Sequence, residues 1–258
     1  MTASNRPFQP DDSPLVSVIM PCWNGSKTIA KAITSVREQT FTDWELVVAD
    51  DGSTDRSEAI VSEFSKVDPR VKLVAHEDAQ SGAAAARNRA LRASTGRYIA
   101  FLDADDLWLP DKLAVQISTM QKHSLAFSCT SYWVRRPSRP DVLRTPPALI
   151  TRPILLRGNR IGCLTAVYDS QVLGKQPMPN ITRRQDYALW CHLLTLTECA
   201  VGIPRPLAIH NRSSNSLSSS ALLSTIATWK MFRTEAGLSR RQSTVSLGQH
   251  LLNRLLRG

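Results

Sequence analysis

The chain has 258 residues, of which 42% are hydrophobic, so it is long and apolar enough to bury one substantial core. Its formal net charge of +10 at pH 7 predicts an anionic partner, such as a nucleotide sugar, an anionic lipid headgroup or a nucleic acid. We expect a cytoplasmic protein rather than a secreted or membrane-spanning one, because the sequence shows no signal-peptide pattern, no apolar run near the roughly 20 residues that span a bilayer, and five cysteines without a Cys-x-x-Cys spacing.

Strands and helices are predicted to alternate through the first part of the chain. Apolar runs of strand length occupy residues 15–20, 44–49, 71–75 and 98–102. Helical patterns lie between them, with Ser26 capping the first helix, Ser53 or Thr54 capping the second, and an Ala-rich helix at 82–93. This order predicts right-handed crossovers and a mostly parallel α/β sheet that is covered on both faces.

Polar residues are expected to gather where these strands end, because ligands of such sheets bind beyond the carboxyl ends of the strands. Asn24, Asp51 and Asp105 fall at three of these ends. The segment Asp-Ala-Asp-Asp at 103–106 crowds three acids together, which costs repulsion and desolvation unless a cation lies among them. Oxygen ligands suit Mg²⁺ or Mn²⁺, so the cluster predicts a metal site; the alternative is a solvated turn.

Several short motifs follow one another in a fixed order and spacing. They are Val-Ile-Met-Pro-Cys-Trp-Asn at 18–24, Ser-Val-Arg-Glu-Gln-Thr at 35–40, Trp-Glu-Leu-Val-Val-Ala-Asp-Asp-Gly-Ser-Thr-Asp at 44–55, Gly-Arg-Tyr-Ile at 96–99 and Pro-Asp-Lys-Leu at 110–113, together with the acids at 103–106. This series resembles the inverting family-2 glycosyltransferases with the GT-A fold, of the bacterial kind that builds surface polysaccharide. The resemblance spans about residues 14–218.

The resemblance implies a domain organisation. Residues 14–218 are expected to form a GT-A domain, an α/β fold with a Rossmann-like, mostly parallel nucleotide-binding sheet. Within it, 14–113 are expected to make the nucleotide-sugar half and 114–218 the acceptor half. Residues 1–13 would be an N-terminal tail and 219–258 a C-terminal helical extension.

The resemblance also implies how the nucleotide of the donor is bound. In the family, the carboxylate at the position of Asp51 accepts from the nucleobase, and the aromatic ring at the position of Trp23 lies against it; Pro21 and Asn24 belong to the same donor-binding segment. A carboxylate accepts an imide N–H well, and a planar ring stacks on a base. The alternatives are that Asp51 is a turn or cap residue and that Trp23 packs against the protein.

For the acidic motif, the resemblance implies that Asp105 binds a Mn²⁺ or Mg²⁺ ion that holds the donor diphosphate, and that Asp103 contacts the donor sugar or ribose. A cation at this place offsets the charge that develops on the departing nucleoside diphosphate. Arg87 matches a basic position that lies near the donor in relatives; the alternative is a solvated helix residue.

Transfer to a hydroxyl needs a base nearby, because the pKa of the hydroxyl lies far above neutrality. The segment Thr-Arg-Arg-Gln-Asp-Tyr-Ala-Leu-Trp at 182–190 resembles the family's acidic motif before a helix, which implies that Asp186 is the catalytic base. Gln185 replaces a Glu that often precedes this base, and it can hydrogen-bond without adding negative charge. Alternatively, Asp186 is an N-terminal helix residue favoured by the macrodipole.

Residues 206–212 and 216–218 resemble the family's closing segment with a departure. His210 stands at its aromatic position and Asn211 at its usual Arg position, with Arg212 displaced by one, which leaves the phosphate-contacting role of this segment in doubt. His210 is a candidate to reach the metal or the diphosphate, and Asp103 and His210 are both candidates either to bind the ion directly or to support its ligand. The alternative is a purely structural histidine.

Two further segments are rich in basic residues. Residues 134–153 contain many Pro and Arg and are predicted to form a loop near the acceptor, or else an ordinary surface connection. From residue 221 onward the pattern predicts two helices, the second of them basic and amphipathic. Residues 239–258 are therefore predicted to contact an anionic membrane at the inner face of the cell, or to pack on the catalytic domain or a second subunit.

The combined prediction is a metal-dependent inverting glycosyltransferase. It would move a sugar from a nucleoside-diphosphate sugar, with UDP favoured, to a hydroxyl of a glycan or lipid-linked acceptor in polysaccharide or lipopolysaccharide biosynthesis. One alternative is a relative that binds nucleotide sugars without catalysis, because of Gln185 and Asn211. A nucleotidyltransferase is disfavoured by the lack of a Gly-rich phosphate loop after the first strand, and a nucleic-acid partner is not expected because the basic residues are dispersed.

Overall fold

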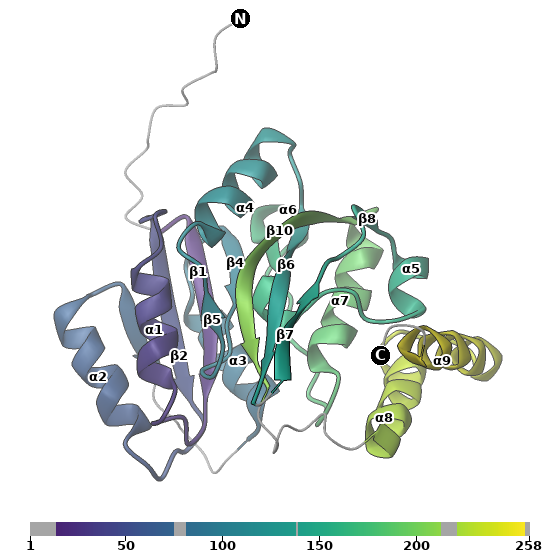
Figure 1. Ribbon diagram of the computed structural model, residues 1–258, viewed down its shortest axis with the longest axis horizontal. Coiled ribbons are helices and arrows are strands. Elements are labelled where there is room, and N and C mark those ends of the chain that lie inside the picture. The colour runs from purple at the N-terminus through teal and green to yellow at the C-terminus, as the bar shows by residue number, and fades with distance from the viewer. Residues whose placement is uncertain (1–13, 75–80, 138, 213–220, 256–258) are drawn as a thin grey trace, which may run out of the picture.

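A computed structural model describes residues 14–74, 81–137, 139–212 and 221–255 (Figure 1). The strands are β1 Val16–Cys22, β2 Trp44–Asp50, β3 Val71–Val74, β4 Tyr98–Phe101, β5 Leu107–Trp108, β6 Phe127–Arg136, β7 Arg139–Arg144, β8 Leu149–Ile150, β9 Val167–Asp169 and β10 Ala200–Asn211. The helices are α1 Ile29–Arg37, α2 Ser57–Val67, α3 Ala83–Ala93, α4 Lys112–Lys122, α5 Arg152–Leu156, α6 Ser170–Leu173, α7 Gln185–Leu196, α8 Ala221–Thr234 and α9 Arg240–Leu255, with a 3-10 turn at Cys163–Thr165.

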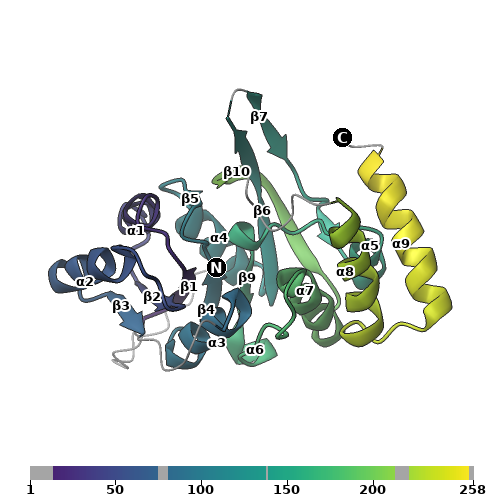
Figure 2. The ribbon, with the colours of Figure 1, turned by 90° about the horizontal axis from the view of Figure 1, so that it is seen from below.

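The described strands form one ten-stranded sheet in the order β3-β2-β1-β4-β9-β6-β10-β5, with β7 paired to β6 and β8 to β10. Helices cover both faces of this sheet, as the view from below shows (Figure 2). Successive strand residues point to opposite faces, so Val18 packs in the cluster that includes α1 and α4, and Ile19 packs in the cluster that includes α3 and α7. The core is thus two apolar layers with the sheet between them.

The four strands predicted in the first part of the chain all form, and they pair in parallel. β1 lies between β2 and β4, and β3 adds to the outer side of β2. Every residue of β2 is buried, as expected for a strand that helices cover on both faces. β9 inserts antiparallel between β4 and β6, so β6 and its parallel neighbour β10 run in the same direction as β1. The predicted α/β sheet is confirmed.

The predicted caps of the first two helices are wrong, because these residues form hydrogen bonds within and between the loops instead. α1 begins after Ser26, whose N–H donates to Asp55 Oδ2 at 3.0 Å. α2 begins beyond both Ser53 and Thr54, and the Ser53 hydroxyl donates to Asp50 Oδ1 at 2.5 Å. Neither α1 nor α2 has a side-chain hydrogen bond from its cap residue.

Residues 134–153, predicted to be a loop, instead form the end of β6, then β7 and β8, and the start of α5. β7 pairs antiparallel with β6, with Arg144 opposite Tyr132 and Arg139 opposite Arg136. Pro140 is tolerated within β7 because this strand has a pairing partner on one side only. The resulting hairpin projects from the body of the protein (Figure 2).

Two C-terminal helices form, as predicted. α9 packs on the body of the protein: Asn253 Nδ2 donates to the carbonyl of the residue that follows α5 at 3.0 Å, and the His250 ring stacks on Tyr187 with ring centroids 6.1 Å apart. The apolar face predicted for this helix is therefore not buried as a whole, because Val245 and Leu252 are exposed to solvent.

Some predictions fall outside the described residues. These are the N-terminal tail at 1–13, the segment at 216–218 with the predicted domain end at 218, and the last residues of the predicted membrane helix at 256–258. Within the described part of the chain, no helix is both long enough and apolar enough to cross a bilayer.

Candidate active site

The predicted donor-site residues lie in loops that leave the sheet at one edge. β1 pairs in parallel register with β2 on one side and with β4 on the other. The loops after these three strands, which carry Asn24, Asp51 and Asp105, therefore start side by side at the edge drawn lowest in Figure 1.

The loop after β1 is held by Asn24, whose backbone is left-handed with φ 49°. Its N–H donates to Ser53 Oγ at 2.8 Å, and its Oδ1 accepts from the Thr54 N–H at 2.8 Å. Asn24 therefore ties the loop after β1 to the loop after β2. Trp23, next to it, is 54% exposed, so its ring does not pack in the core, and Pro21 lies half-buried within β1.

Asp51 joins the end of β2 to the start of α3. Its Oδ1 accepts from the Ser81 N–H at 3.2 Å and from the Ser81 hydroxyl at 2.9 Å, and its Oδ2 accepts from the Gly82 N–H at 2.7 Å. Burial raises the pKa of Asp51, but these hydrogen bonds outweigh burial and hold the pKa below its usual value. The carboxylate is therefore ionised and fixed in place at the donor edge.

Two of the three acids at 103–106 have partners within the protein. Asp103 Oδ1 accepts from Arg87 Nη2 at 2.5 Å. Asp106 is buried, with Oδ1 3.0 Å from His210 Nδ1 and accepting from the Asn211 N–H at 2.9 Å. Burial lowers the pKa of His210, but Asp106 outweighs burial and the pKa of His210 is raised. His210 thus supports the acidic loop from behind through Asp106.

Asp105 is the acid of this loop that has no ion pair among the described residues, and its side chain is exposed. Partial desolvation, together with the charges of Asp106 and Asp103, raises the pKa of Asp105 to about 6. Asn211 Nδ2 donates to the Asp105 carbonyl at 2.7 Å, which holds the loop while leaving the carboxylate open. Excess negative charge on an exposed hard oxygen ligand fits a divalent ion.

The described residues do not make a complete metal cage, since no group of three His, Cys, Asp or Glu side chains among them converges on one point. An ion at Asp105 would therefore need most of its ligands from substrate oxygens and water. Mg²⁺ and similar ions are commonly held in this way, by one or two carboxylates together with phosphate oxygens.

Arg87 connects the acidic loop to the second half of the chain. It is 8% exposed, so the alternative of a solvated helix residue is wrong. Its Nη2 donates to Asp103 and its Nη1 donates to Gln185 Oε1 at 2.9 Å, while Gln185 Nε2 donates to the Ile181 carbonyl at 2.7 Å. One guanidinium thereby positions both the acidic loop and the first turn of α7.

Asp186 lies in this first turn of α7, which begins after Arg184, a residue with a left-handed backbone. Its Oδ2 accepts from Asn159 Nδ2 at 3.3 Å. Burial raises the pKa of Asp186, and the nearby Asp103 adds to this, while Arg184 and Arg87 oppose it; the net shift is upward. A carboxylate with a raised pKa is a stronger base and suits proton abstraction near neutral pH.

The sequence did not reveal Asn159 or the functions of Asp106 and Gln185. Asn159 lies in an irregular segment with no periodic pattern, so nothing in the sequence pointed to its contact with Asp186. Asp106 carried a signal as the third acid of the cluster, but only the fold shows that it faces His210.

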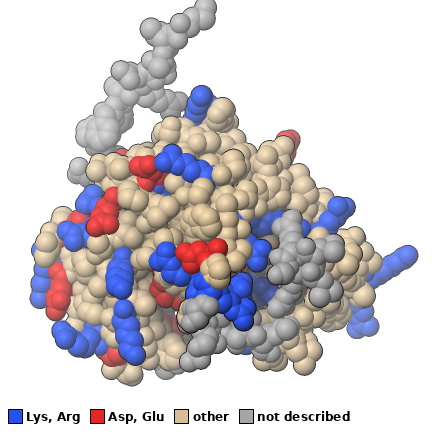
Figure 3. Space-filling model, in the orientation of Figure 1, with Lys and Arg blue, Asp and Glu red and all other residues tan. Residues whose placement is uncertain are grey.

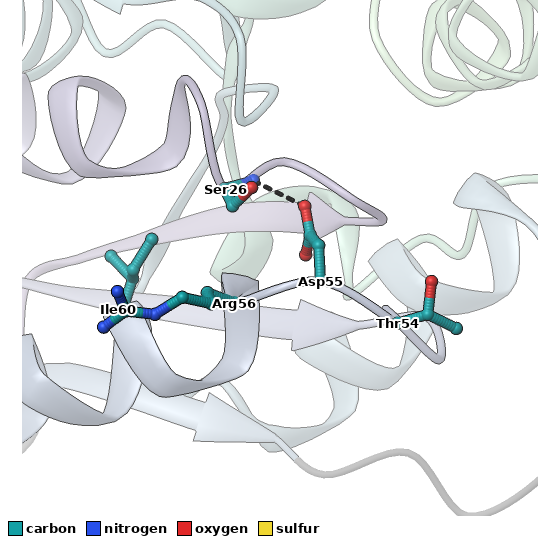
Figure 4. A pocket seen from close by; sticks show the side chains of 5 residues that line it. All are labelled: Ser26, Thr54, Asp55, Arg56 and Ile60. Atoms are coloured by element: carbon teal, nitrogen blue, oxygen red, sulfur yellow. Dashed lines mark hydrogen bonds between the residues drawn. The ribbon is translucent and has the colours of Figure 1, made fainter.

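A separate hollow lies beside the loops after β1 and β2 and is lined by Ser26, Thr54, Asp55, Arg56 and Ile60 (Figure 4). Asp55 Oδ2 accepts from the Ser26 N–H at 3.0 Å, and its other oxygen accepts from the Ser57 N–H at 2.9 Å. Ser26 and Asp55 therefore join the two loops, and the hollow contains none of the predicted site residues.

Comparison with known proteins agrees with this geometry. Residues 17–170 match the family model described as glycosyl transferase family 2. The chain is 38% identical over 242 residues to the putative teichuronic acid biosynthesis glycosyltransferase TuaG of Bacillus subtilis, covering 93% of this chain and 96% of that protein. It is 43% identical over 183 residues to the UDP-Glc:alpha-D-GlcNAc-diphosphoundecaprenol beta-1,3-glucosyltransferase WfgD of Escherichia coli, covering 71% of each.

Solved structures share the fold at lower identity. TarS of S. aureus in complex with UDP-GlcNAc has a TM-score of 0.71 at 19% identity, over 92% of this chain and 71% of that one. The mannosyltransferase PcManGT of Pyrobaculum calidifontis, in complex with GDP-Man and Mn²⁺, has a TM-score of 0.65 at 20% identity, over 96% of this chain and 72% of that one. These likenesses confirm the expected GT-A fold.

Proposed function

The chain belongs to glycosyl transferase family 2, and we propose that it transfers a sugar from a UDP-sugar to a hydroxyl of a lipid-linked glycan in the biosynthesis of a surface polysaccharide. The acceptor class is supported by WfgD, whose name gives a sugar linked through a diphosphate to a polyprenyl lipid. The net charge of +10 favours binding of both substrates, because the donor and the acceptor each contain a negatively charged diphosphate.

The single observation that carries the proposal is the meeting of three elements around Arg87. Its guanidinium contacts Asp103 of the acidic loop and Gln185 of α7. The negative charge of Asp186 also helps to raise the pKa of Arg87. A donor-side acid and a base candidate are thereby brought to one place from segments far apart in the chain. A transferase needs this juxtaposition, because the leaving group and the acceptor hydroxyl lie on opposite faces of one carbon.

A divalent ion, Mn²⁺ or Mg²⁺, is proposed to bind at Asp105. The exposed carboxylate without an ion pair among the described residues supports this place. When bound, the ion would offset the charge that develops on the departing diphosphate. Asp103, held by Arg87, is proposed to contact the donor sugar or ribose, and His210 to keep the loop in position through Asp106.

On the nucleotide side, the exposed ring of Trp23 is proposed to lie against the nucleobase, and Asp51 to accept from its N–H. Asp51 already accepts from Ser81 and Gly82, which fixes its carboxylate at the start of α3. Pro21 and Asn24 are proposed to shape the loop that carries Trp23.

For the chemical step, Asp186 is proposed to accept the proton of the acceptor hydroxyl. The hydroxyl oxygen bonds to the anomeric carbon as the bond from that carbon to the diphosphate oxygen breaks, and the nucleoside diphosphate leaves with the bonding electrons. Attack comes from the face opposite the leaving group, so the configuration inverts. The raised pKa of Asp186, caused mainly by burial, supports its use as the base.

The protein is proposed to act in the cytoplasm, peripherally at the inner face of the membrane, with 239–258 contributing to the contact. Exposed Val245 and Leu252 together with exposed Arg240 and Arg241 on α9 support contact with an anionic surface. Pelleting with anionic vesicles tests it: the Val245→Ser/Leu252→Ser variant should bind more weakly than the wild type, and equal binding would remove α9 from the contact.

Two other functions have less support. A binding-only relative was suggested by Gln185 and Asn211, but Gln185 accepts from Arg87 and Asn211 holds the Asp105 carbonyl, so both substitutions have a place in the site. A nucleic-acid-binding module has no support in the comparisons, since the matched family is one of glycosyl transferases.

Calorimetric binding of UDP, GDP, dTDP and CMP, with and without Mn²⁺, tests the donor assignment. UDP should bind most tightly and should need the metal. Tight binding of GDP or dTDP in place of UDP would change the donor class, and no binding of any nucleotide under either condition would contradict the transferase.

A further inference from the structure

The hairpin formed by β6 and β7, which we call the arginine hairpin, carries an excess of positive charge. Residues 127–144 contain Arg135, Arg136, Arg139 and Arg144 against the single acid Asp141. Asp141 pairs with Arg135 at 3.3 Å. Lys and Arg side chains gather in the lower middle of the face in Figure 3, where Figure 1 draws β7.

The register of the hairpin sets like charges against each other. Arg139 lies directly opposite Arg136 across the two strands, a pairing that is destabilising in a sheet. The Nε of Arg136 is buried and has no hydrogen-bond partner among the described residues. The two side chains thus lack a counter-charge within the described chain, and an anion between them would supply one.

The arginine hairpin lies next to the acidic loop. This loop leaves β4 and enters β5, and in the sheet β5 lies beyond β6 and β10, so the loop crosses the carboxyl ends of both strands. The Arg212 N–H donates to the Arg135 carbonyl at 2.9 Å. The preceding residue, Asn211, donates through its N–H to Asp106 Oδ1 and through its Nδ2 to the Asp105 carbonyl. Two consecutive residues, Asn211 and Arg212, therefore contact the acidic loop and the hairpin.

The base of the hairpin lies near the segment that contacts the proposed catalytic base. Arg144 lies opposite Tyr132 on β6, and the Tyr132 ring lies against Gly162. Asn159, three residues before Gly162, donates to Asp186 Oδ2 at 3.3 Å.

We propose that the arginine hairpin binds the diphosphate through which the acceptor sugar is linked to its lipid. This inference rests on the proposed function, because it takes a diphosphate-linked acceptor as the substrate. Arginine binds phosphate oxygens through two parallel N–H donors, which gives both charge and geometry. The donor diphosphate is proposed to lie at Asp105, whereas the hairpin projects from the body of the protein beside that loop (Figure 2), so we assign the hairpin to the second diphosphate, that of the acceptor.

A direct binding measurement tests the hairpin without requiring turnover. Titration calorimetry with a short-chain isoprenyl diphosphate, in the presence of saturating UDP and Mn²⁺, is done on the wild type and on Arg136→Gln/Arg139→Gln. Loss of two charged hydrogen bonds predicts binding weakened by about tenfold or more. The matched control Arg56→Gln/Arg92→Gln changes two exposed arginines elsewhere and should bind as the wild type does. Equal binding by the hairpin variant, or no binding by the wild type, overturns the proposal.

Folding is checked through a milder variant. Arg139 is exposed, so Arg139→Gln alone should keep the thermal unfolding temperature of the wild type and still weaken diphosphate binding severalfold. Arg139→Lys keeps the charge but loses the paired donors, and an intermediate affinity is expected. If Arg139→Gln folds normally and binds at full strength, the hairpin does not contact the diphosphate.

Transfer assays show whether the double variant is impaired because it has lost contact with the acceptor diphosphate or for another reason. The acceptors are a GlcNAc diphosphate with a short alkyl chain and the matching GlcNAc alkyl glycoside, both used without membranes. The double variant should raise KM for the first acceptor, with little change in kcat, and should leave the second unchanged. Equal loss on both acceptors overturns the proposal. No transfer by the wild type to either acceptor contradicts the proposed function instead, while the calorimetry still decides the hairpin.

Phospholipid is the competing source of phosphate. Pelleting with phosphatidylglycerol vesicles is compared between the wild type and the double variant. If the variant loses vesicle binding but keeps its KM for the soluble diphosphate acceptor, the hairpin contacts the membrane surface and the proposal fails. If it keeps vesicle binding and loses affinity for the acceptor, the diphosphate assignment stands.

Discussion

The carboxylates in the first part of the sheet differ from those around the acidic loop in the direction of their pKa shifts. Glu45 and Asp51 are buried, yet the pKa of each is lowered, because hydrogen bonds outweigh the effect of burial. Asp106 and Asp186 have raised pKa values because burial outweighs their partners, and the pKa of the exposed Asp105 is raised by partial desolvation together with the charges of Asp106 and Asp103.

The difference separates Glu45 and Asp51 from Asp105 and Asp186, the two acids proposed for chemistry, while Asp106 holds the acidic loop through His210. Glu45 accepts from Lys72, Ser17 and Thr95, so its charge is used entirely in joining β1, β2 and β3 to the turn before β4. A carboxylate whose charge the protein leaves poorly compensated stores electrostatic strain that a substrate or a metal can relieve. Such acids occur here in the loop after β4, which contacts the end of β10, and in the first turn of α7.

The largest expected effect is the loss of sugar transfer when Asp186 is replaced. Asp186→Asn keeps the shape of the side chain but removes the proton acceptor, so the rate of sugar transfer should fall by on the order of 10²- to 10⁴-fold. Nucleotide binding by calorimetry should be unchanged. Glu235→Gln, which changes an exposed acid on the C-terminal side, is the control and should keep full activity. Substantial turnover by Asp186→Asn would place the base elsewhere.

Asp105→Ala should abolish the metal-dependent part of UDP binding, because Asp105 is the proposed protein ligand of the ion. The comparison is the ratio of Kd values with and without Mn²⁺, which should approach one in this variant. Asp111→Ala removes an exposed acid that pairs with Arg205 and should retain the wild-type ratio. If Asp105→Ala still shows metal-dependent binding, the ion lies at another residue.

Asp68 tests the structural class of acids. Hydrogen bonds from Arg70 lower its pKa to about 2, although burial opposes them. Because the folded value lies below the unfolded one, the stabilisation is present above pH 4 or so and is lost as the pH falls toward 2. Asp68→Asn should therefore reduce the free energy of unfolding by about 2 kcal/mol at pH 7.

Chemical denaturation at a series of pH values measures this effect. The difference between Asp68→Asn and the wild type should shrink as the pH falls through the window from about 4 to about 2. Glu63→Gln, at an exposed acid with a pair distance of 3.9 Å, should differ little from the wild type at any pH. A constant difference between Asp68→Asn and the wild type would show that the effect is not electrostatic.

The smallest expected effect comes from Gln185→Glu. A second carboxylate on Arg87 would neutralise part of its charge and add negative charge beside Asp186, so the pKa of Asp186 should rise further. The base would then stay protonated to a higher pH, and the acid limb of the kcat/KM profile should move upward. Gln185→Leu adds no charge and serves as the control for the lost hydrogen bond. If the acid limb of the kcat/KM profile does not move in Gln185→Glu, residue 185 does not influence the pKa of the catalytic base.

Much of the first part of the fold follows from local patterns. The strands at β1, β2 and β4 were predictable because fully buried parallel strands are continuous apolar runs, and the acids after β4 were visible as a crowded cluster. The helix caps were not predictable, because Ser26 bonds to Asp55 and Ser53 bonds to Asn24 and Asp50, and neither bonds to the nearest helix.

The rest depended on contacts between distant residues. Arg87 and Gln185 are 98 positions apart, and Asn159 contacts Asp186 from an irregular segment. The strand β7 was hidden because its Pro and Arg content is typical of a loop, and only pairing with β6 makes it a strand. Local composition cannot encode such pairings, so the second half of the site was less visible than the first.

The stereochemistry of transfer tests the central claim most directly. The wild type is incubated with Mn²⁺, a soluble diphosphate-linked acceptor and an α-linked UDP-sugar, and the new linkage is read from the anomeric coupling constant in the proton NMR spectrum. A β-linked product, formed by the wild type and not by Asp186→Asn, is the result that attack assisted by Asp186 predicts. An α-linked product would require retention and would contradict the account.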